Sequence, residues 1–194
     1  IIHVNAGTYT ETRQCNLAVG VSIEGAGRAT TIIRSEITGQ WSTLLQLNSG
    51  QNTNGNQRIS GITIDGQYES ESNNKTWIGI WVTGRSNVLI HDCSIINFRD
   101  RGAIFDGNNV TDPVTDPGNY ATGNKFYNNT VLNTAAVTAN YGAGMLNIGG
   151  QQGMEIYGNT MIQNQRVAFK NGWPIKYWDN GWLKGCKIYN NTLT

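Results

Sequence analysis

The densest group of side chains that could do chemistry is an aromatic segment near the end of the chain. Residues 171–182 hold three of the six tryptophans, together with a tyrosine, a lysine and an aspartate. Aromatic rings pack against the C–H faces of sugars while amides and charged groups bond to the hydroxyls, so these residue types suit a carbohydrate-binding site. The predicted contact residues are Trp173, Lys176, Tyr177, Trp178 and Trp182. The same segment could instead fold as a lid whose rings cover an apolar part of the core.

Charge is unevenly distributed around this segment. Residues 163–194 carry five basic and one acidic side chain, a balance of +4, whereas residues 1–162 carry nine basic and twelve acidic ones, a balance of −3. A basic aromatic region suits an acidic glycan, although scattered lysines could equally keep a sheet edge soluble. The net charge of +1 is far from the basic surface that phosphate-backbone binding requires, so nucleic acid is not an expected partner.

No complete catalytic set is evident, so the sequence leaves open whether the chain is an enzyme. A polysaccharide lyase needs a Lys or Arg base with a neutralising cation, and a glycoside hydrolase needs paired carboxylates. The nearest acid–base cluster is Arg99-Asp100-Arg101 with Asp106, which also fits a solvated turn with weak surface ion pairs. If the aromatic region is catalytic, the candidate bases are Arg166, Lys170 and Lys176.

Two further groups of residues could form metal or redox sites. Oxygen-bearing side chains at Asp106, Asn108 and Asp112 could ligate Ca²⁺, but the Asp-Pro and Pro-Gly pairs that follow explain the segment as a plain loop. We therefore expect no cofactor. The three cysteines, at positions 15, 93 and 186, lack metal-ligand spacing and are interpreted as small buried hydrophobes.

All these groups must be positioned by strands, because the composition disfavours helices. The chain has 25 Asn and 24 Gly against only 9 Leu, a balance typical of short strands and tight turns. A six-residue phrase also recurs, as in Ile156-Tyr157-Gly158-Asn159-Thr160-Met161. Its copies lie at 18–23, 59–64, 90–95, 126–131, 156–161 and 188–193. A unit of this size cannot bury its apolar face alone, so the repeat predicts stacked coils.

Each position of the phrase makes its own prediction. The third position holds residue types that tolerate positive φ and should form stacked bends: Gly20, Gly61, Asp92, Asn128, Gly158 and Asn190. The fourth position should place Asn129, Asn159 and Asn191 in an internal amide ladder. The second position should stack His91 on an outward row of Tyr127, Tyr157 and Tyr189 rather than make it a general base. The fifth position is an outward hydroxyl row: Ser22, Thr63, Ser94, Thr130, Thr160 and Thr192.

A second strand pattern lies between the phrases, as at Gly79-Ile80-Trp81-Val82 and Gly102-Ala103-Ile104-Phe105. Each coil should then carry about three short strands, stacked on the next coil at about 4.8 Å through parallel sheets. The third-position residues are 30 to 41 residues apart, which requires loops of variable length. We therefore expect an all-β solenoid of about six coils with irregular loops.

The phrase ending Asn-Asn-Thr, with Val4-Asn5-Ala6-Gly7-Thr8-Tyr9 and Val21-Ser22-Ile23-Glu24-Gly25-Ala26-Gly27, resembles the right-handed parallel β-helix of the pectate-lyase-like superfamily. The resemblance covers nearly the whole chain and implies the fold. It does not imply one activity, because the superfamily includes lyases, hydrolases, phage tailspikes and non-catalytic surface proteins. The last two phrases are also similar to secreted bacterial β-helix repeat proteins, which implies export to the cell surface or medium.

We expect residues 1–194 to form one β-helix domain and to be part of a longer chain, because neither end shows the polar cap that a repeat rod needs. Other domains or chains could stack on the uncapped ends. No run of about 18 apolar residues predicts a membrane span. The favoured function is a non-catalytic or structural module that binds polysaccharide. The alternatives are a lyase or hydrolase of an acidic glycan and an adhesin or tailspike-like assembly protein.

Overall fold

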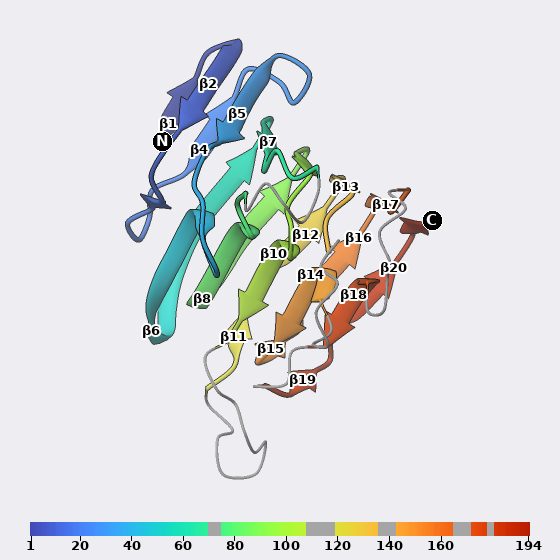
Figure 1. Ribbon diagram of the computed structural model, residues 1–194. Coiled ribbons are helices and arrows are strands. Elements are labelled where there is room, and N and C mark those ends of the chain that lie inside the picture. The colour runs from blue at the N-terminus through green and yellow to red at the C-terminus, as the bar shows by residue number, and fades with distance from the viewer. Residues whose placement is uncertain (70–74, 108–118, 136–142, 165–171, 178–180) are drawn as a thin grey trace.

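Parallel sheets account for all the regular structure that is described. The computed structural model describes residues 1–69, 75–107, 119–135, 143–164, 172–177 and 181–194. Within these ranges there are 21 strands and no helix. The strands form three sheets in which every pairing is parallel. Figure 1 shows the strands running side by side from the N-terminus to the C-terminus. The prediction of an all-β parallel solenoid is confirmed.

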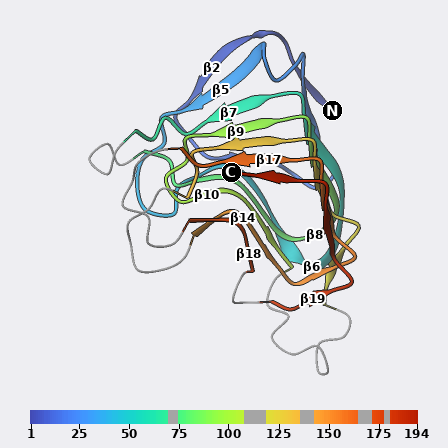
Figure 2. The ribbon, with the colours of Figure 1, turned by 90° about the vertical axis from the view of Figure 1, so that its right-hand side faces the viewer.

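One sheet contains a single short strand from each layer, and Figure 2 shows these strands stacked in chain order. Its strands are β2 (Gly7–Glu11), β5 (Thr31–Ser35), β7 (Thr63–Asp65), β9 (Ser94–Ile96), β13 (Thr130–Leu132), β17 (Thr160–Ile162) and β21 (Thr192–Leu193). This sheet has seven strands and therefore seven layers, one more than the repeats suggested. The additional layer comes from the first eleven residues, which do not contain the phrase.

The largest sheet covers two sides of the coil, because two of its strands are long enough to span both. These are β6 (Thr43–Ser60) and β8 (Ile78–His91). We call one side the β10 arm: β3 (Cys15–Asn16), the first halves of β6 and β8, β10 (Arg101–Asp106), β14 (Ala143–Gly149) and β18 (Gly172–Tyr177). The other side is the β12 arm: β1 (Ile2–Val4), β4 (Ile23–Gly25), the second halves of β6 and β8, β12 (Lys125–Tyr127), β16 (Glu155–Tyr157) and β20 (Lys187–Tyr189). A small sheet of β11 (Ala121–Thr122), β15 (Gln151–Gln152) and β19 (Leu183–Lys184) joins the arms.

The bends of the last five phrase copies have the predicted backbone. Residues 61, 92, 128, 158 and 190 all have φ between 52° and 66°. The strands on either side of these bends pair in register, so His91 lies beside Tyr127 and Ser94 beside Thr130. The hydroxyl row is likewise in register from Thr63 to Thr192. Thr63 is nevertheless buried, and its hydroxyl donates to the Arg28 carbonyl, while Ser22 is buried and does not belong to the row.

The first phrase copy was assigned to the wrong bend. Ile23 pairs with Ile59 and Glu24 with Ser60, so Gly25, rather than Gly20, stacks on Gly61. A Cβ on Gly61 would lie 2.7 Å from the Gly25 carbonyl oxygen, which explains the glycine pair. Gly20 also has positive φ, at 79°, but its N–H donates to the carbonyl of Gly55 at another corner. A glycine that tolerates positive φ fits either corner, so its type could not decide between them.

The predicted amide ladder lies inside the bends. Asn159 Oδ1 accepts from Asn129 Nδ2 at 3.2 Å, and Asn159 Nδ2 donates to Asn191 Oδ1 at 2.9 Å. Asn129 Oδ1 accepts from the Cys93 backbone N–H at 3.0 Å, so a cysteine begins the ladder. Each amide also donates to a main-chain carbonyl one layer below, which leaves few backbone groups of the bend unsatisfied.

A second internal polar row, which sequence reasoning missed, lies at the opposite corner of the coil. Asn124 Nδ2 lies 2.8 Å from Gln151 Oε1 and 2.9 Å from the carbonyl of Arg85. The buried guanidinium of Arg85 donates to Gln57 Oε1 at 2.6 Å. Burial lowers the pKa of Arg85 from its ordinary value. The residues do not share a sequence phrase, so no periodic signal could have revealed the row.

The apolar core fills the coil along its whole length. Ile, Leu, Val, Phe and Met side chains from all three sheets meet there, and most are fully buried. The three cysteines are free, and they are buried or pack against this core, as predicted. Burial raises the pKa of the Cys93 thiol to about 12. In the described ranges no helix reaches the length and apolarity that a membrane crossing requires.

Candidate aromatic site on the last strand of the β10 arm

Strand β18 carries three of the five predicted contact residues. Trp173, Lys176 and Tyr177 pair with Gly144, Asn147 and Ile148 of β14. Within the described part of the chain β14 is the only strand that pairs with β18, so β18 forms the open edge of the arm. Trp173 is 44% exposed and Tyr177 is 46% exposed. The rings therefore reach solvent, and the alternative of a lid buried on the core does not hold for these two.

Side chains of β18 line an open depression of about 300 Å³, formed by Trp173, Ile175, Lys176 and Tyr177. Ile175 is anchored because it packs against the main core. The Lys176 ammonium lies 5.7 Å from the centroid of the Trp173 ring, within the range of a cation–π contact. This contact holds a positive charge beside an exposed aromatic face.

Asn147 is a buried polar residue on β14, beside Lys176 of the depression. It is 0% exposed and is paired with Lys176 across the two strands. Its Oδ1 accepts from the Gly144 N–H at 2.9 Å, whereas its Nδ2 has no hydrogen-bond partner among the described residues. A buried donor left unpaired costs about 1–3 kcal/mol, so a hydrogen-bond acceptor at this position would be stabilising.

The remaining predicted contact residues are only partly described. Trp182 is 49% exposed and lies at the next corner of the coil, where its carbonyl accepts from the Gln151 N–H at 3.2 Å. Trp178 and two of the candidate bases, Arg166 and Lys170, lie outside the described residues. The structure thus brings Trp173, Lys176 and Tyr177 onto one strand and adds Trp182 in the same layer.

The cluster around Asp100 differs from the expected solvated turn. The side chain of Asp100 is 0% exposed and that of Arg101 is 4% exposed, and the two form a close ion pair. Asp106 does not join them, because it lies at the other end of β10. The prediction of a solvated turn was wrong. A short run of charged residues has the same sequence pattern whether its corner is exposed to solvent or covered by side chains that are distant in sequence.

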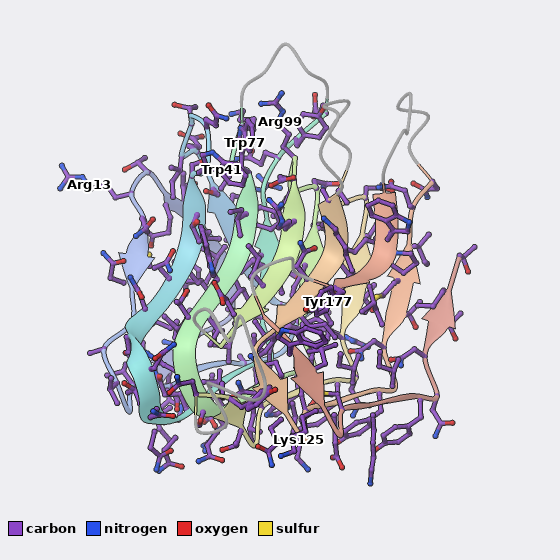
Figure 3. All side chains as sticks on the ribbon, turned by 90° about the horizontal axis from the view of Figure 1, so that it is seen from below. Arg13, Trp41, Trp77, Arg99, Lys125 and Tyr177 are labelled. Atoms are coloured by element: carbon purple, nitrogen blue, oxygen red, sulfur yellow. The ribbon has the colours of Figure 1, made fainter. Side chains whose placement is uncertain are left out.

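Two tryptophans that sequence reasoning left unassigned cover this corner. The rings of Trp41 and Trp77 have centroids 5.5 Å apart. The Arg99 guanidinium lies 4.4 Å from the Trp77 ring, and that of Arg101 lies 5.3 Å from the Trp41 ring. Figure 3 places Trp41, Trp77 and Arg99 together at one end of the strands, well apart from Tyr177. The isolated positions of these tryptophans in the sequence gave no signal that they would meet.

The predicted calcium ligands are only partly described. Asp106 ends β10, but Asn108 and Asp112 lie outside the described residues, so the calcium site stays a prediction. Among the described residues no three His, Cys, Asp or Glu side chains cluster as metal ligands would.

The outward aromatic row is confirmed, since the rings of His91, Tyr127, Tyr157 and Tyr189 stack with centroids 4.7, 5.0 and 5.1 Å apart.

Comparison with known proteins identifies the fold. No protein-family model and no curated protein matches the chain. A solved structure of a pectin methylesterase mutant in complex with a hexasaccharide matches with a TM-score of 0.51 and 12% identity, over 91% of this chain and 61% of that one. The chain is a right-handed parallel β-helix.

Weaker likenesses extend to other proteins. An α-1,3-glucanase from Streptomyces thermodiastaticus matches with a TM-score of 0.45 and 16% identity, over 89% of this chain and 36% of that one. A tailspike of Acinetobacter baumannii bacteriophage Fri1, a capsular polysaccharide depolymerase, matches with a TM-score of 0.39 and 10% identity, over 97% of this chain and 41% of that one. The chain therefore spans less than two thirds of the length of each of these three structures.

Proposed function

We propose that the chain binds polysaccharide through the depression on β18. The observation that carries this proposal is the pair of exposed rings, Trp173 and Tyr177, on either side of Ile175 and Lys176. Exposed aromatic faces bind the C–H faces of sugars, and the anchored isoleucine adds apolar contact. The ammonium of Lys176 can donate hydrogen bonds to sugar oxygens.

The preferred ligand is an acidic glycan. Lys176 is the charged group of the depression, and residues 163–194 carry a balance of +4. A carboxylate accepts charge-assisted hydrogen bonds, which are stronger than those of a neutral hydroxyl. Trp178 and Trp182 would extend the contact along the same layer. We place this activity at the cell surface or in the medium, where such polysaccharides are met.

The favoured role is binding without catalysis, and the alternative is a lyase or hydrolase. Lys176 is the described candidate for a lyase base, with Arg166 and Lys170 as the other candidates. Proton abstraction would also need a cation to neutralise the sugar carboxylate, and Ca²⁺ held by Asp106, Asn108 and Asp112 would be the candidate for it. We propose no reaction step through these groups.

A second candidate function is assembly, and exposed apolar side chains favour it. Ile188 and Leu193, on the last strands of the β12 arm and the seven-stranded sheet, are 52% and 50% exposed. Another chain or domain stacked on this layer would bury them at roughly 25 cal/mol per Å². An adhesin or tailspike-like protein would use the end of the coil in this way.

The test is a panel of polysaccharides followed by two readouts at once. Polygalacturonate, alginate and hyaluronan represent acidic glycans, and dextran and mannan represent neutral ones. Retardation in affinity electrophoresis reports binding, and ultraviolet absorbance reports the unsaturated products of a lyase. Retardation by an acidic glycan that is lost in Trp173→Ala supports the proposal. Absence of retardation by every glycan refutes it, and absorbance growth replaces the non-catalytic role with the lyase.

A further inference from the structure

A groove on the outer face of the β12 arm lies away from the aromatic depression. It encloses about 250 Å³ and is lined by Ser22, Asn56, Gln57, Arg58, Asn87, Leu89 and Gly123. Small-molecule pockets usually measure roughly 300–1,000 Å³, so the groove has the size of one sugar residue rather than of a long segment. Its surface is more polar than that of the depression, because amides and a guanidinium surround one leucine.

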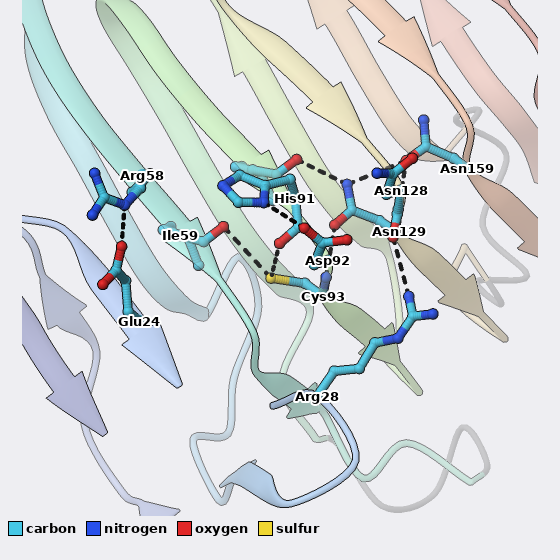
Figure 4. Close-up of polar contacts among 11 residues, drawn as sticks. Glu24, Arg28, Arg58, Ile59, His91, Asp92, Cys93, Asn128, Asn129 and Asn159 are labelled. Carbon is cyan, nitrogen blue, oxygen red and sulfur yellow. Dashed lines mark hydrogen bonds and ion pairs between the residues drawn. The ribbon is translucent and has the colours of Figure 1, made fainter. Parts of the chain in front are cut away.

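The register of the strands explains why the groove is open over Leu89. Leu89 pairs with Arg58 on one side and with Lys125 on the other, so two long cationic side chains flank it. Arg58 pairs with Glu24, in the layer before it, and Figure 4 shows this pair lying apart from His91. Lys125 Nζ pairs with Glu155 Oε2 at 2.9 Å, in the layer after it. Both cations therefore lean away from Leu89 and leave its side chain as an apolar floor.

Asn56 and Asn87, which have positive φ angles of 46° and 56°, provide polar groups to the groove. Asn87 Nδ2 donates to Asn54 Oδ1 at 2.9 Å, which orients its amide. Asn87 Oδ1 lies over Gly123, where a Cβ would collide with it, so only glycine leaves this amide its position. Asn56 is exposed and offers a donor and an acceptor. The ring of His91, two residues after Leu89, is fixed by its stack on Tyr127 and by Asp92, 2.7 Å from Nδ1.

The charge balance of the groove selects the ligand. Each neighbouring cation has a carboxylate partner: Glu24 neutralises Arg58, and Glu155 neutralises Lys125. Because the two cations that flank Leu89 are both paired with carboxylates, the groove favours the hydroxyls of a neutral sugar over the carboxylate of an acidic one. Arg58 uses its Nε toward Glu24, and a guanidinium has four further N–H donors, which suit hydroxyl oxygens.

We propose that this groove is a second carbohydrate site, which binds one residue of a neutral glycan. The C–H face of the sugar would pack on Leu89, and its hydroxyls would bond to Arg58, Asn56 and Asn87. The site is independent of the depression on β18, and its neutral preference contrasts with the acidic preference proposed there.

The test uses leucine-methyl NMR of the full chain with maltohexaose, cellohexaose and mannohexaose as neutral probes and a galacturonate hexasaccharide as the acidic probe. At least one neutral probe should shift the Leu89 methyl signals. Leu89→Arg, which fills the groove, should weaken that binding at least about ten-fold. Thr130→Arg, on a half-buried outward position of β13, is the matched control and should leave it unchanged, as should Trp173→Ala.

The outcomes distinguish this proposal from the previous one. Loss of neutral-probe binding in Leu89→Arg but not in Trp173→Ala supports the groove, even if no acidic glycan binds. The groove is refuted if no neutral probe shifts Leu89, or if Leu89→Arg binds as tightly as the wild type. Shifts at Leu89 with the galacturonate probe alone refute the neutral ligand. Asn87→Ala, which leaves the groove open, should weaken binding less than Leu89→Arg does.

Discussion

The amide ladder at Asn129, Asn159 and Asn191 and the aromatic depression on β18 differ in how their residues are held. Each ladder residue contacts an equivalent residue in the next layer, so the same hydrogen bonds recur along the coil. Trp173, Lys176 and Tyr177 each occur once, and no equivalent residues precede them on β14. In this β-helix the repeated positions stabilise the fold, and the proposed recognition depends on residues of an outer strand that depart from the repeat.

The ladder should show the largest effect on stability. Asn159→Ala removes an amide that accepts from the Asn129 N–H at 2.9 Å and donates to the Phe126 carbonyl at 2.9 Å. Because buried partners are left unsatisfied, we expect a loss of about 3 kcal/mol in the free energy of unfolding, measured by urea denaturation. Asn164→Ala, at an exposed asparagine, is the control and should cost less than about 0.5 kcal/mol. Equal losses of unfolding free energy in the two variants would show that the ladder amide stabilises the fold no more than an exposed asparagine does.

The depression should show the opposite pattern, an effect on binding with little effect on stability. Trp173→Ala removes a ring that is 44% exposed. We expect about a ten-fold loss of affinity for an acidic glycan, which corresponds to about 1.4 kcal/mol, measured by calorimetry. The urea midpoint should change little, since the ring is not part of the buried core. A large loss of stability with unchanged affinity would show that Trp173 stabilises the fold and does not bind the glycan.

A third substitution tests whether a repeated position can be restored. Cys93 occupies the ladder position, and its Sγ lies 3.6 Å from the Ile59 carbonyl, where the amides of later layers donate. Cys93→Asn should therefore extend the ladder and keep the unfolding free energy within about 1 kcal/mol of the wild type. Cys93→Leu, which is larger and apolar, is the control. If Cys93→Asn unfolds as readily as Cys93→Leu, the first rung does not have ladder geometry.

The smallest effect on stability is expected at the ion pair of Lys125 and Glu155, beside the groove. Lys125 lowers the pKa of Glu155 from its ordinary value of 4.5. A carboxyl with a lowered pKa in the folded state stabilises it above the unfolded pKa, and this contribution is lost as the pH falls through the folded value. Between pH 7 and pH 3 the melting temperature of the wild type should thus fall slightly more than that of Lys125→Gln. An identical fall in both proteins would show that the pair contributes nothing to stability.

Much of the fold could be predicted because the same local requirement recurs. Positive φ at the bend and an internal asparagine after it identify the phrase, as at Asn128-Asn129 and Asn190-Asn191. The first copy was misplaced because residues 18–23 and 23–28 both have a glycine at the third position, so the residue type could not decide between Gly20 and Gly25. The buried row of Gln57, Arg85, Asn124 and Gln151 could not be predicted, since its members differ in type and follow loops of unequal length.

The candidate site was predictable in composition but not in geometry. The density of aromatic residues identified Trp173 and Tyr177, and the structure shows that they are exposed on one strand. The Leu89 groove has no sequence signal, because it arises where two ion pairs draw Arg58 and Lys125 apart. The burial of Asp100 was missed for a similar reason, since the tryptophans at that corner come from separate parts of the chain.

The most direct measurement of the proposed recognition is the ¹H–¹⁵N spectrum of the tryptophan indoles during titration with a galacturonate hexasaccharide. Exposed Trp173 and Trp182 should shift together, while buried Trp77 should not move. The shifts should follow one binding curve and disappear in Lys176→Ala. Indole signals that stay unchanged at saturating glycan, or that move only at Trp41, would contradict polysaccharide binding at β18.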